Sequence, residues 1–196
     1  MQIRRRLVLA SQSPRRALLL KQIGFQADIV PSGVPESFDS TMSPEDNAMR
    51  LALMKAQDVG ATIDDAIIIG ADTIVVVGSE LLAKPEDPDD AVRMLELLSG
   101  RSHVVHTGFS LLDRPSGRSM TDVESTKVTF RPIPREEIDE YVAGGSPMDK
   151  AGAYGIQDDY GAVFATRIEG CFYNVVGFPL SLFYSTLMLF QQQLKG

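Results

Sequence analysis

Asp72 is the residue whose place in the sequence most favours catalytic or metal-binding chemistry. It follows an apolar run at residues 67–70 and comes just before a second run at residues 74–77, which predicts a carboxylate at the tip of a buried strand. Because a buried aspartate without partners is costly or becomes protonated, we expect Asp72 at the mouth of a cleft with a cation opposite. There it could bind a divalent metal ion or take a proton from water. A role limited to capping a turn is the alternative that residues 71–73 leave open.

Residues 11–16 combine hydroxyl and guanidinium groups at the expected start of a helix. Pro14 suits the first helical position and Ser13 suits the cap before it, while the apolar residues 7–10 predict a strand upstream. The free N–H groups and positive dipole of a helix N-terminus attract anions, and arginine can bind phosphate oxygens with two hydrogen bonds. A surface helix with solvated arginines is the alternative, and the segment lacks the glycines and lysine of a Walker A loop. The candidate phosphate ligands here are Ser11, Ser13, Arg15 and Arg16.

Other residue types that often carry chemistry stand in less specific surroundings. Lys84 precedes Pro85, which confines it to extended backbone at the end of a loop. His103 and His106 alternate with valines on an expected strand, with no Cys, Asp or Glu at metal-ligand spacing, so we expect structural roles for both. Cys171 has no histidine near it in the sequence, and its apolar neighbours favour a packing role over that of a nucleophile.

The elements that must position these residues alternate between strands and helices, which predicts an α/β fold. Strands are expected at residues 7–10, 28–30, 67–77, 81–82, 104–112 and 124–130, followed by a hairpin of 163–168 with 172–176. Helices are expected to begin near Pro14, Ser43, Asp87, Pro134 and Phe178, and glycines such as Gly60 are expected just beyond their ends. Lys55 falls on the second of these helices, where a solvated face is the default position. The small residues within 146–157 leave little to pack and would let backbone approach a ligand closely.

The bulk composition is that of an ordinary globular chain. With 196 residues, of which 44% are hydrophobic and 23% charged, the sequence predicts one domain with a sizeable core. The net charge of −7 argues against a nucleic-acid polymer or an anionic membrane as the main partner, because both favour a basic surface. One cysteine allows no intramolecular disulfide, and the apolar runs at 7–10 and 180–190 are too short for a signal peptide and a membrane span. We therefore expect a cytoplasmic protein, with a homodimer as the commonest assembly.

Six motifs resemble the signatures of the Maf family of nucleoside triphosphate pyrophosphatases. They occur in order at residues 9–16, 70–75, 84–85, 98–108, 149–157 and 174–179, and so run through nearly the whole chain. The resemblance implies one domain over residues 1–196, with a central mixed, twisted β-sheet flanked by helices and two lobes around a cleft. It also implies hydrolysis of a nucleoside triphosphate between the α and β phosphates, giving a monophosphate and pyrophosphate, with a divalent metal required.

The resemblance also assigns roles to individual residues. Asp72 matches the catalytic acidic residue, and the positions that set substrate specificity are matched by Arg15, Thr73 and Gln157. The motif Gly155-Ile156-Gln157 resembles the branch that takes dTTP and UTP, rather than the branch that acts on 7-methyl-GTP. Two places depart from the usual pattern: Ser146 stands where many members have glutamate, and Asp158-Asp159 follow the motif where some members have glycine.

From these residues we expect charge neutralisation and water activation at one site. Asp72 and Glu36 would hold Mg²⁺ or Mn²⁺ against the phosphates, or Asp72 would act as the base on the attacking water, and the sequence leaves both roles open. The Gln157 amide offers a donor and an acceptor, which can match two of the three groups on the pairing edge of uracil or thymine. The phosphate oxygens would be bound by Arg15, Arg16, Lys55 and Lys84, with help from Ser11, Ser13 and the helix N-terminus.

Other functions for the same residues stay open. The chemistry could act on 7-methyl-GTP or other non-standard nucleotides, or on modified pyrimidine triphosphates beside dTTP and UTP. A non-catalytic nucleotide sensor linked to cell division arrest would use the same pocket without hydrolysis. A dinucleotide-binding oxidoreductase is disfavoured, because no Gly-x-Gly-x-x-Gly follows any expected strand. An assay of pyrophosphate release on a panel of nucleotides separates these possibilities.

Overall fold

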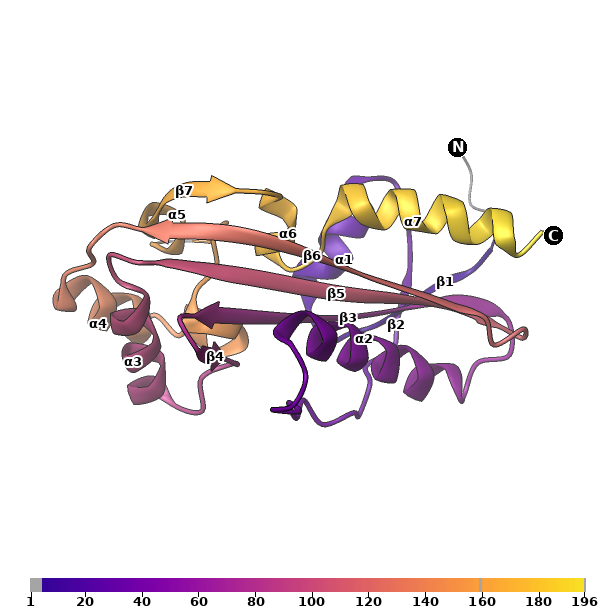
Figure 1. Ribbon diagram of the computed structural model, residues 1–196, viewed down its shortest axis with the longest axis horizontal. Coiled ribbons are helices and arrows are strands. Elements are labelled where there is room, and N and C mark those ends of the chain that lie inside the picture. Colours follow the sequence, from indigo (N-terminus) through magenta and orange to yellow (C-terminus); the bar gives the residue numbers. More distant parts are fainter. Residues whose placement is uncertain (1–4, 159, 196) are drawn as a thin grey trace. The chain divides into compact units, whose positions relative to one another are not determined.

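The computed structural model describes residues 5–158 and 160–195, and over these residues the chain forms seven strands and seven α-helices (Figure 1). The strands are β1 (Leu7–Ala10), β2 (Asp28–Ile29), β3 (Ala66–Val77), β4 (Glu80–Leu82), β5 (Ser102–Arg114), β6 (Ser119–Phe130) and β7 (Ala165–Glu169). The α-helices are α1 (Pro14–Gln22), α2 (Pro44–Gly60), α3 (Pro88–Leu98), α4 (Arg135–Ala143), α5 (Gly161–Phe164), α6 (Phe172–Val176) and α7 (Leu180–Gln193). Two short 3-10 helices, η1 (Ser146–Asp149) and η2 (Ala151–Ala153), lie between α4 and α5. The predicted α/β fold class is confirmed.

The described strands form one mixed sheet in the order β2-β1-β3-β5-β6-β7, with β4 paired to β3. β1 is parallel to both β2 and β3, whereas β4 is antiparallel to β3 and β7 is antiparallel to β6. β1 and β3 are in register at Ala10 and Gly70, the last pair that they form. β1 ends there, whereas β3 continues to Val77 and pairs with β4 over its last three residues.

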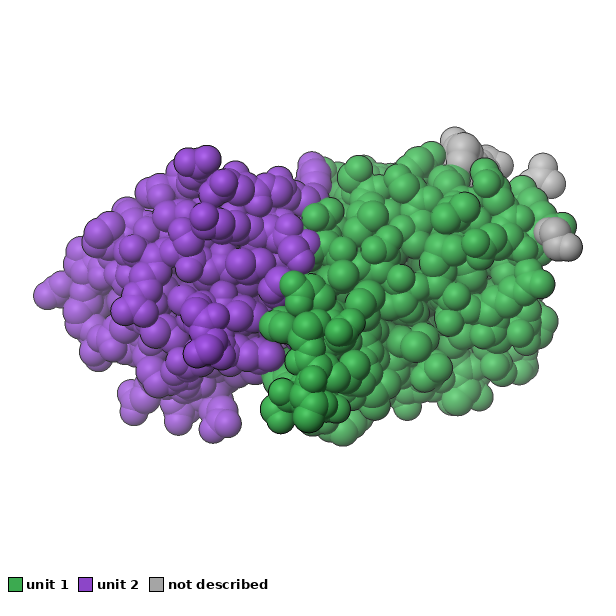
Figure 2. Space-filling view, viewed as in Figure 1, with its two compact units in different colours: residues 1–72, 107–124, 177–196 green, residues 73–106, 125–176 purple. Residues whose placement is uncertain are grey.

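The described residues divide into two compact units (Figure 2). The first unit, in green, consists of residues 5–72, 107–124 and 177–195; the second, in purple, consists of residues 73–106, 125–158 and 160–176. Strands β3, β5 and β6 each contribute residues to both units. The cleft between two lobes and the single domain over residues 1–196 stay predictions.

In the first unit, helix α2 packs closely on β3 and β5 because each strand carries a glycine at the contact. A Cβ atom on Gly70 would lie 2.0 Å from the Ala52 carbonyl oxygen, and one on Gly108 would lie 2.4 Å from the Ala48 carbonyl carbon. The Ser43 side chain caps the first turn of α2, where the sequence predicts the start of this helix. Glycine at both strand positions therefore sets how near α2 can come to β3 and β5.

The opposite face of β5 in the first unit is covered by aromatic side chains. Phe109 follows Gly108 on the strand, so its side chain points to the other face. Its ring packs against those of Phe178 and Phe183, with ring centroids 6.0 and 5.8 Å apart, and Phe183 belongs to α7. Figure 1 shows α7 and α2 on opposite sides of the strands. The first unit thus has a helix on each face of its sheet.

The second unit has an aromatic core. Phe130 on β6 contacts His103, Tyr154 and Phe164, and the ring of Tyr141 on α4 packs edge-on against Phe164. Helix α3 packs against α4 and against η2. These contacts hold the segment of residues 146–157 against the body of the unit, although its small side chains predict little packing.

The predicted hairpin of residues 163–168 with 172–176 is wrong. Residues 172–176 form helix α6, and β7 pairs with β6 instead. The buried Asn174 side chain donates hydrogen bonds of 2.9 Å to the Val105 carbonyl oxygen and to the Thr126 hydroxyl. Because these partners come from distant parts of the sequence, the alternation of apolar residues at 172–176 does not reveal them.

Smaller differences concern the ends of elements. Gly60 is the last residue of α2, not a residue beyond it, and residues 163–164 belong to α5. β5 and β6 extend further than predicted, up to the turn at residues 115–118 that joins them. Across residues 5–158 and 160–195, no helix has both the length and the apolar character needed to cross a membrane.

Candidate active site

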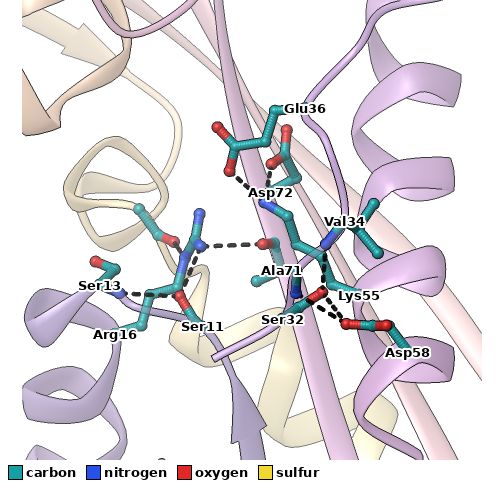
Figure 3. Close-up of polar contacts among 12 residues, drawn as sticks. Ser11, Ser13, Arg16, Ser32, Val34, Glu36, Lys55, Asp58, Ala71 and Asp72 are labelled. Carbon is teal, nitrogen blue, oxygen red and sulfur yellow. Dashed lines mark hydrogen bonds and ion pairs between the residues drawn. The ribbon is translucent and has the colours of Figure 1, made fainter. Parts of the chain in front are cut away.

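Three charged side chains from three segments of the first unit meet beside the middle of β3 (Figure 3). The prediction of Asp72 at the tip of a strand is wrong, because β3 continues past it to Val77. The Lys55 ammonium on α2 donates hydrogen bonds of 2.6 Å to Oδ1 of Asp72 on β3 and to Oε1 of Glu36 in the segment before α2. The side chains of Lys55 and Asp72 are only 8% and 7% exposed, whereas that of Glu36 is 40% exposed. Lys55 is thus the cation predicted opposite the buried Asp72.

The close packing of α2 on β3 explains how Lys55 reaches this position. The helix residues nearest to Gly70 are Ala52 and Ala56, and Lys55 lies on the same side of α2, one position before Ala56. With no Cβ on Gly70, the lysine stem can pass over the strand to Asp72, two residues further on. The default expectation of a solvated Lys55 is therefore wrong, and the residue is 6% exposed.

The segment that carries Glu36 is tied to α2 by Asp58 (Figure 3). Asp58 Oδ2 accepts hydrogen bonds from the Ser32 hydroxyl at 2.8 Å and from the Gly33 amide at 2.9 Å, and the Ser32 oxygen accepts one from the Val34 amide at 3.2 Å. The bond from Ser32, and then that from Gly33, lower the pKa of Asp58. The sequence alone does not identify Asp58 as the anchor of this segment. The one hint in the sequence is that Asp58 lies one helical turn after Lys55 on α2.

Arg16 lies buried beside the same part of β3, at the start of α1. Its Nη1 atom donates to the Ala71 carbonyl oxygen at 3.0 Å and to the Ser11 hydroxyl at 3.1 Å, and its Nε atom donates to the Gly177 carbonyl oxygen at 3.0 Å. Ser11 and Ala71 directly follow the last residues paired between β1 and β3. The register of two parallel strands therefore brings the loop before α1 next to the middle of β3, beyond the end of β1, where the strand order changes direction and ligands commonly bind.

Burial and charge act in opposite directions on these groups. Burial raises the pKa of Asp72, and Glu36 adds to the rise, while Lys55 and Arg16 oppose it. Burial likewise lowers the pKa of Arg16. The charges of Asp72 and Glu36 raise this pKa, and the charge of Arg15 lowers it further. The result is a carboxylate that binds a proton more readily than an exposed aspartate while it is surrounded by cations. That property suits a proton acceptor.

Ser13 and Arg15 complete the predicted phosphate site at the start of α1. Ser13 precedes the first helical residue, its side chain makes no capping hydrogen bond, and its backbone N–H donates to the Ser11 hydroxyl at 3.1 Å. Arg15 is partly exposed and lowers the pKa of Arg16, so two guanidinium groups lie near each other. The candidates that the first unit brings together are Ser11, Ser13, Arg15, Arg16, Glu36, Lys55 and Asp72.

The remaining candidates belong to the second unit. Thr73 directly follows Asp72 on β3 and is partly exposed, and Lys84 is exposed just after β4. Gln157 donates from Nε2 to Asp158 Oδ2 at 2.7 Å. The convergence of these three residues on the phosphate-binding residues of the first unit stays a prediction.

The histidines and the cysteine have structural surroundings. His103 Nε2 lies 2.7 Å from the Tyr154 hydroxyl, and burial lowers the pKa of His103 to about 4. His106 Nδ1 lies 2.8 Å from the Ser125 hydroxyl, and Cys171 is a free, partly buried thiol. Within the part of the chain that the structure describes, no three His, Cys, Asp or Glu side chains gather where they could hold a metal ion. The two carboxylates predicted as metal ligands, those of Asp72 and Glu36, both accept a hydrogen bond from the Lys55 ammonium.

Known proteins match this sequence over most of its length. The family model described as Maf-like protein matches residues 6–190. The chain belongs to the Maf family. Its Maf relatives include a dTTP/UTP pyrophosphatase of Carboxydothermus hydrogenoformans, 46% identical over 93% of this chain and 97% of that protein. Others named dTTP/UTP pyrophosphatase are from Moorella thermoacetica, 45% identical over 97% of this chain and 98% of that protein, and from Acetivibrio thermocellus, 47% identical over 89% and 90%. The resemblance of the motifs to this family is confirmed.

Proposed function

We propose that this Maf protein is a hydrolase that cleaves dTTP and UTP between the α and β phosphates, releasing the monophosphate and pyrophosphate. The observation that carries the proposal is the buried Asp72 carboxylate, 2.6 Å from the Lys55 ammonium. It stands in a chain whose relatives at 43–47% identity are named dTTP/UTP pyrophosphatases. A buried acid with a raised pKa among cations supports water activation next to a polyanion.

In the proposed reaction, Asp72 accepts a proton from the water that attacks the α phosphorus. Burial makes its carboxylate more basic, and the hydrogen bond from Lys55 to Oδ1 keeps the group in one orientation. A positioned base of this kind contributes roughly a hundredfold to ten-thousandfold in rate. Asp72 is therefore the residue whose loss should reduce turnover most.

The triphosphate would be bound by cations and by the helix start. The N-terminus of α1 offers backbone N–H groups and the positive end of the helix dipole, and Arg16 is held there by three hydrogen bonds. Loss of one contact to a charged group in a desolvated site costs roughly 3 kcal/mol, about a hundredfold in rate. The residues proposed for this role are Ser11, Ser13, Arg15, Arg16, Lys55 and Lys84.

Mg²⁺ or Mn²⁺ fits the donor set of the site. Asp72 and Glu36 both direct a carboxylate oxygen at one ammonium, and hard divalent ions are commonly held by one or two carboxylates together with substrate phosphates and water. When bound, such an ion would neutralise phosphate charge and make the phosphorus more electrophilic. Glu36 and Asp72 are the residues that would hold it, and for Asp72 this role is the alternative to that of proton acceptor.

The pyrimidine base would be recognised by Gln157, with Thr73 shaping the pocket. Uracil and thymine present acceptor, donor and acceptor along their pairing edge, and one amide can match two of these groups. A site that hydrogen-bonds a base in this way rejects a base that leaves its polar groups unpaired.

The test is pyrophosphate release from a panel of dTTP, UTP, CTP, ITP and 7-methyl-GTP, with Mg²⁺ or Mn²⁺ and with a chelator in their place. We expect release from dTTP and UTP, its loss in the chelator, and at least a hundredfold lower turnover in Asp72→Asn. Asp64→Asn is the matched control, because Asp64 is an exposed aspartate of the same unit. Binding without pyrophosphate release would favour a nucleotide sensor, and preference for 7-methyl-GTP would favour the other branch of the family.

The cellular setting follows from the sequence. A single cysteine suits a reducing compartment, so we propose the cytoplasm as the location. A homodimer is the assembly that we propose, as the commonest state of small enzymes. Light scattering of the purified chain, together with fractionation of cells, tests both.

A further inference from the structure

A buried lysine of the second unit is surrounded by acceptors from the segment around Gln157. Lys150 is 7% exposed; its ammonium donates to the Ser146 carbonyl oxygen and to Asp149 Oδ1 at 2.8 Å, and it lies 3.5 Å from Asp158 Oδ2. Asp159, for which the sequence also predicts a departure from the usual pattern, lies outside the described residues. Asp158 thus places a carboxylate beside Lys150.

Asp158 also determines which way the Gln157 amide faces. Its Oδ2 atom accepts a hydrogen bond of 2.7 Å from Gln157 Nε2. An ionised carboxylate has acceptors alone, so an amide turned by half a revolution would set Oε1 against a negatively charged oxygen. Gly155 allows the arrangement, because a Cβ atom there would lie 2.7 Å from Lys150 Cε and 2.8 Å from Asp158 Oδ2. The amide therefore has one favoured orientation.

The carbonyl oxygen of the same amide lacks a hydrogen-bond donor among the described residues. Gln157 Oε1 is buried and accepts no hydrogen bond from the residues that the structure describes. A buried carbonyl oxygen without a donor is disfavoured, and a ligand N–H would relieve the cost, whereas a ligand acceptor would add repulsion. The fixed amide consequently distinguishes ligands by whether they bring a proton to this point.

We propose that Asp158 is a positioning residue for base selection: it holds Gln157 with Oε1 toward the base, so that the N3–H of uracil or thymine is accepted and the bare N3 of cytosine is refused. This deepens the proposed function and rests on it for the contact between Gln157 and the base. Uracil and cytosine differ in just this way, because N3 is a donor in the first and an acceptor in the second. Without Asp158, the amide can turn over and offer its NH₂ group to cytosine.

The experiment measures binding separately from catalysis. Dissociation constants for the α,β-methylene analogues of UTP and CTP are determined by calorimetry with Mg²⁺ present, because these analogues lack the bond to be cleaved. In Asp158→Ala we expect the preference for the UTP analogue over the CTP analogue to fall about tenfold, partly through tighter binding of the CTP analogue. In Asp158→Asn the fall should be smaller, because an amide oxygen can take the place of Oδ2. Asp149→Ala is the matched control: it removes the other carboxylate from Lys150 and should leave the preference unchanged.

Several results would overturn the proposal. Equal weakening of both analogues in Asp158→Ala would assign Asp158 a structural role, and an equal loss of preference in Asp149→Ala would assign the effect to Lys150 alone. Because Asp158 acts through Gln157, adding Asp158→Ala to Gln157→Ala should change the preference no further, and a further change would contradict the coupling. A wild type that binds the UTP analogue preferentially but releases no pyrophosphate from UTP would refute the proposed hydrolysis and leave this inference standing.

Discussion

Removing the lysine that faces Asp72 should destabilise the protein more than an ordinary charge substitution. In Lys55→Met the Asp72 carboxylate stays 7% exposed without its ammonium, and loss of one partner from a buried ion pair costs about 3–5 kcal/mol. Glu36 adds little to this cost, because its side chain is 40% exposed and a pair of that kind contributes at most about 1 kcal/mol. For a chain of 196 residues, such a loss lowers the melting temperature by roughly 10 °C. Urea and thermal unfolding, followed by circular dichroism, measure it.

The double variant Lys55→Met with Asp72→Asn separates the pair from general damage to α2. With neither member of the pair charged, most of the lost stability should return, and the coupling between the two substitutions should be large. Lys21→Met, on the exposed surface of α1, is the matched control and should change stability by no more than about 0.5 kcal/mol. If Lys55→Met alone were as stable as this control, or if the double variant were less stable than the single one, the assignment of Lys55 as the partner of Asp72 would be refuted.

Three further predictions concern packing, pH and base choice. Gly70→Ala should lose about 3 kcal/mol or more, because its Cβ would lie 2.0 Å from a helix carbonyl, whereas Gly33→Ala, with open space around it, should be nearly neutral in thermal unfolding. Burial lowers the pKa of His103 from 6.5 to about 4, so as the pH falls the unfolded chain binds this proton before the folded protein does. Urea titrations should therefore show about 3 kcal/mol of folding stability lost between pH 6.5 and pH 4, and His103→Gln should lack that loss. Gln157→Ala should keep pyrophosphate release but discriminate poorly among bases; an unchanged preference for dTTP on the nucleotide panel would contradict the role of this amide.

Local sequence signals predict the parts of the fold that local chemistry decides. Helices α1, α2 and α3 begin where Pro14, Pro44 and Pro88 follow good capping residues, and β3 contains the apolar runs at residues 67–70 and 74–77. Residues 172–176 fail the same reasoning, since their helix depends on hydrogen bonds from a buried amide to strands elsewhere in the chain. A pattern of alternating polar and apolar residues predicts the local backbone from neighbouring residues. It does not indicate hydrogen-bond partners elsewhere in the chain.

The candidate site divides in the same way. The start of α1 could be predicted because it follows the end of the apolar strand β1, and Asp72 because it is the one charged residue between two apolar runs. That Asp72 lies within one continuous strand, and not at its tip, could not be predicted from the polar residues between these runs. The burial of Lys55 could not be predicted from the sequence of its helix. It depends on how closely α2 approaches Gly70, and so on the packing between the helix and β3. The anchoring of the Glu36 segment by Asp58 was hidden for the same reason: a charge on a helix is usually solvated, and its partner is a loop whose path no local pattern predicts.

The charges of the first unit explain why a divalent ion belongs in the proposed mechanism. Asp72 and Glu36 consume much of the positive charge that Lys55, Arg15 and Arg16 supply, so these five side chains together leave one net positive charge for a substrate that carries several negative ones. A site that bound triphosphate through these cations alone would have to break the pairs of Lys55 and expose a buried Asp72 to further negative charge. A metal ion bound by these two carboxylates would add positive charge to the site while the carboxylates keep a cationic partner. The acids that weaken the cationic site as a phosphate clamp are thus the groups that we propose as metal ligands.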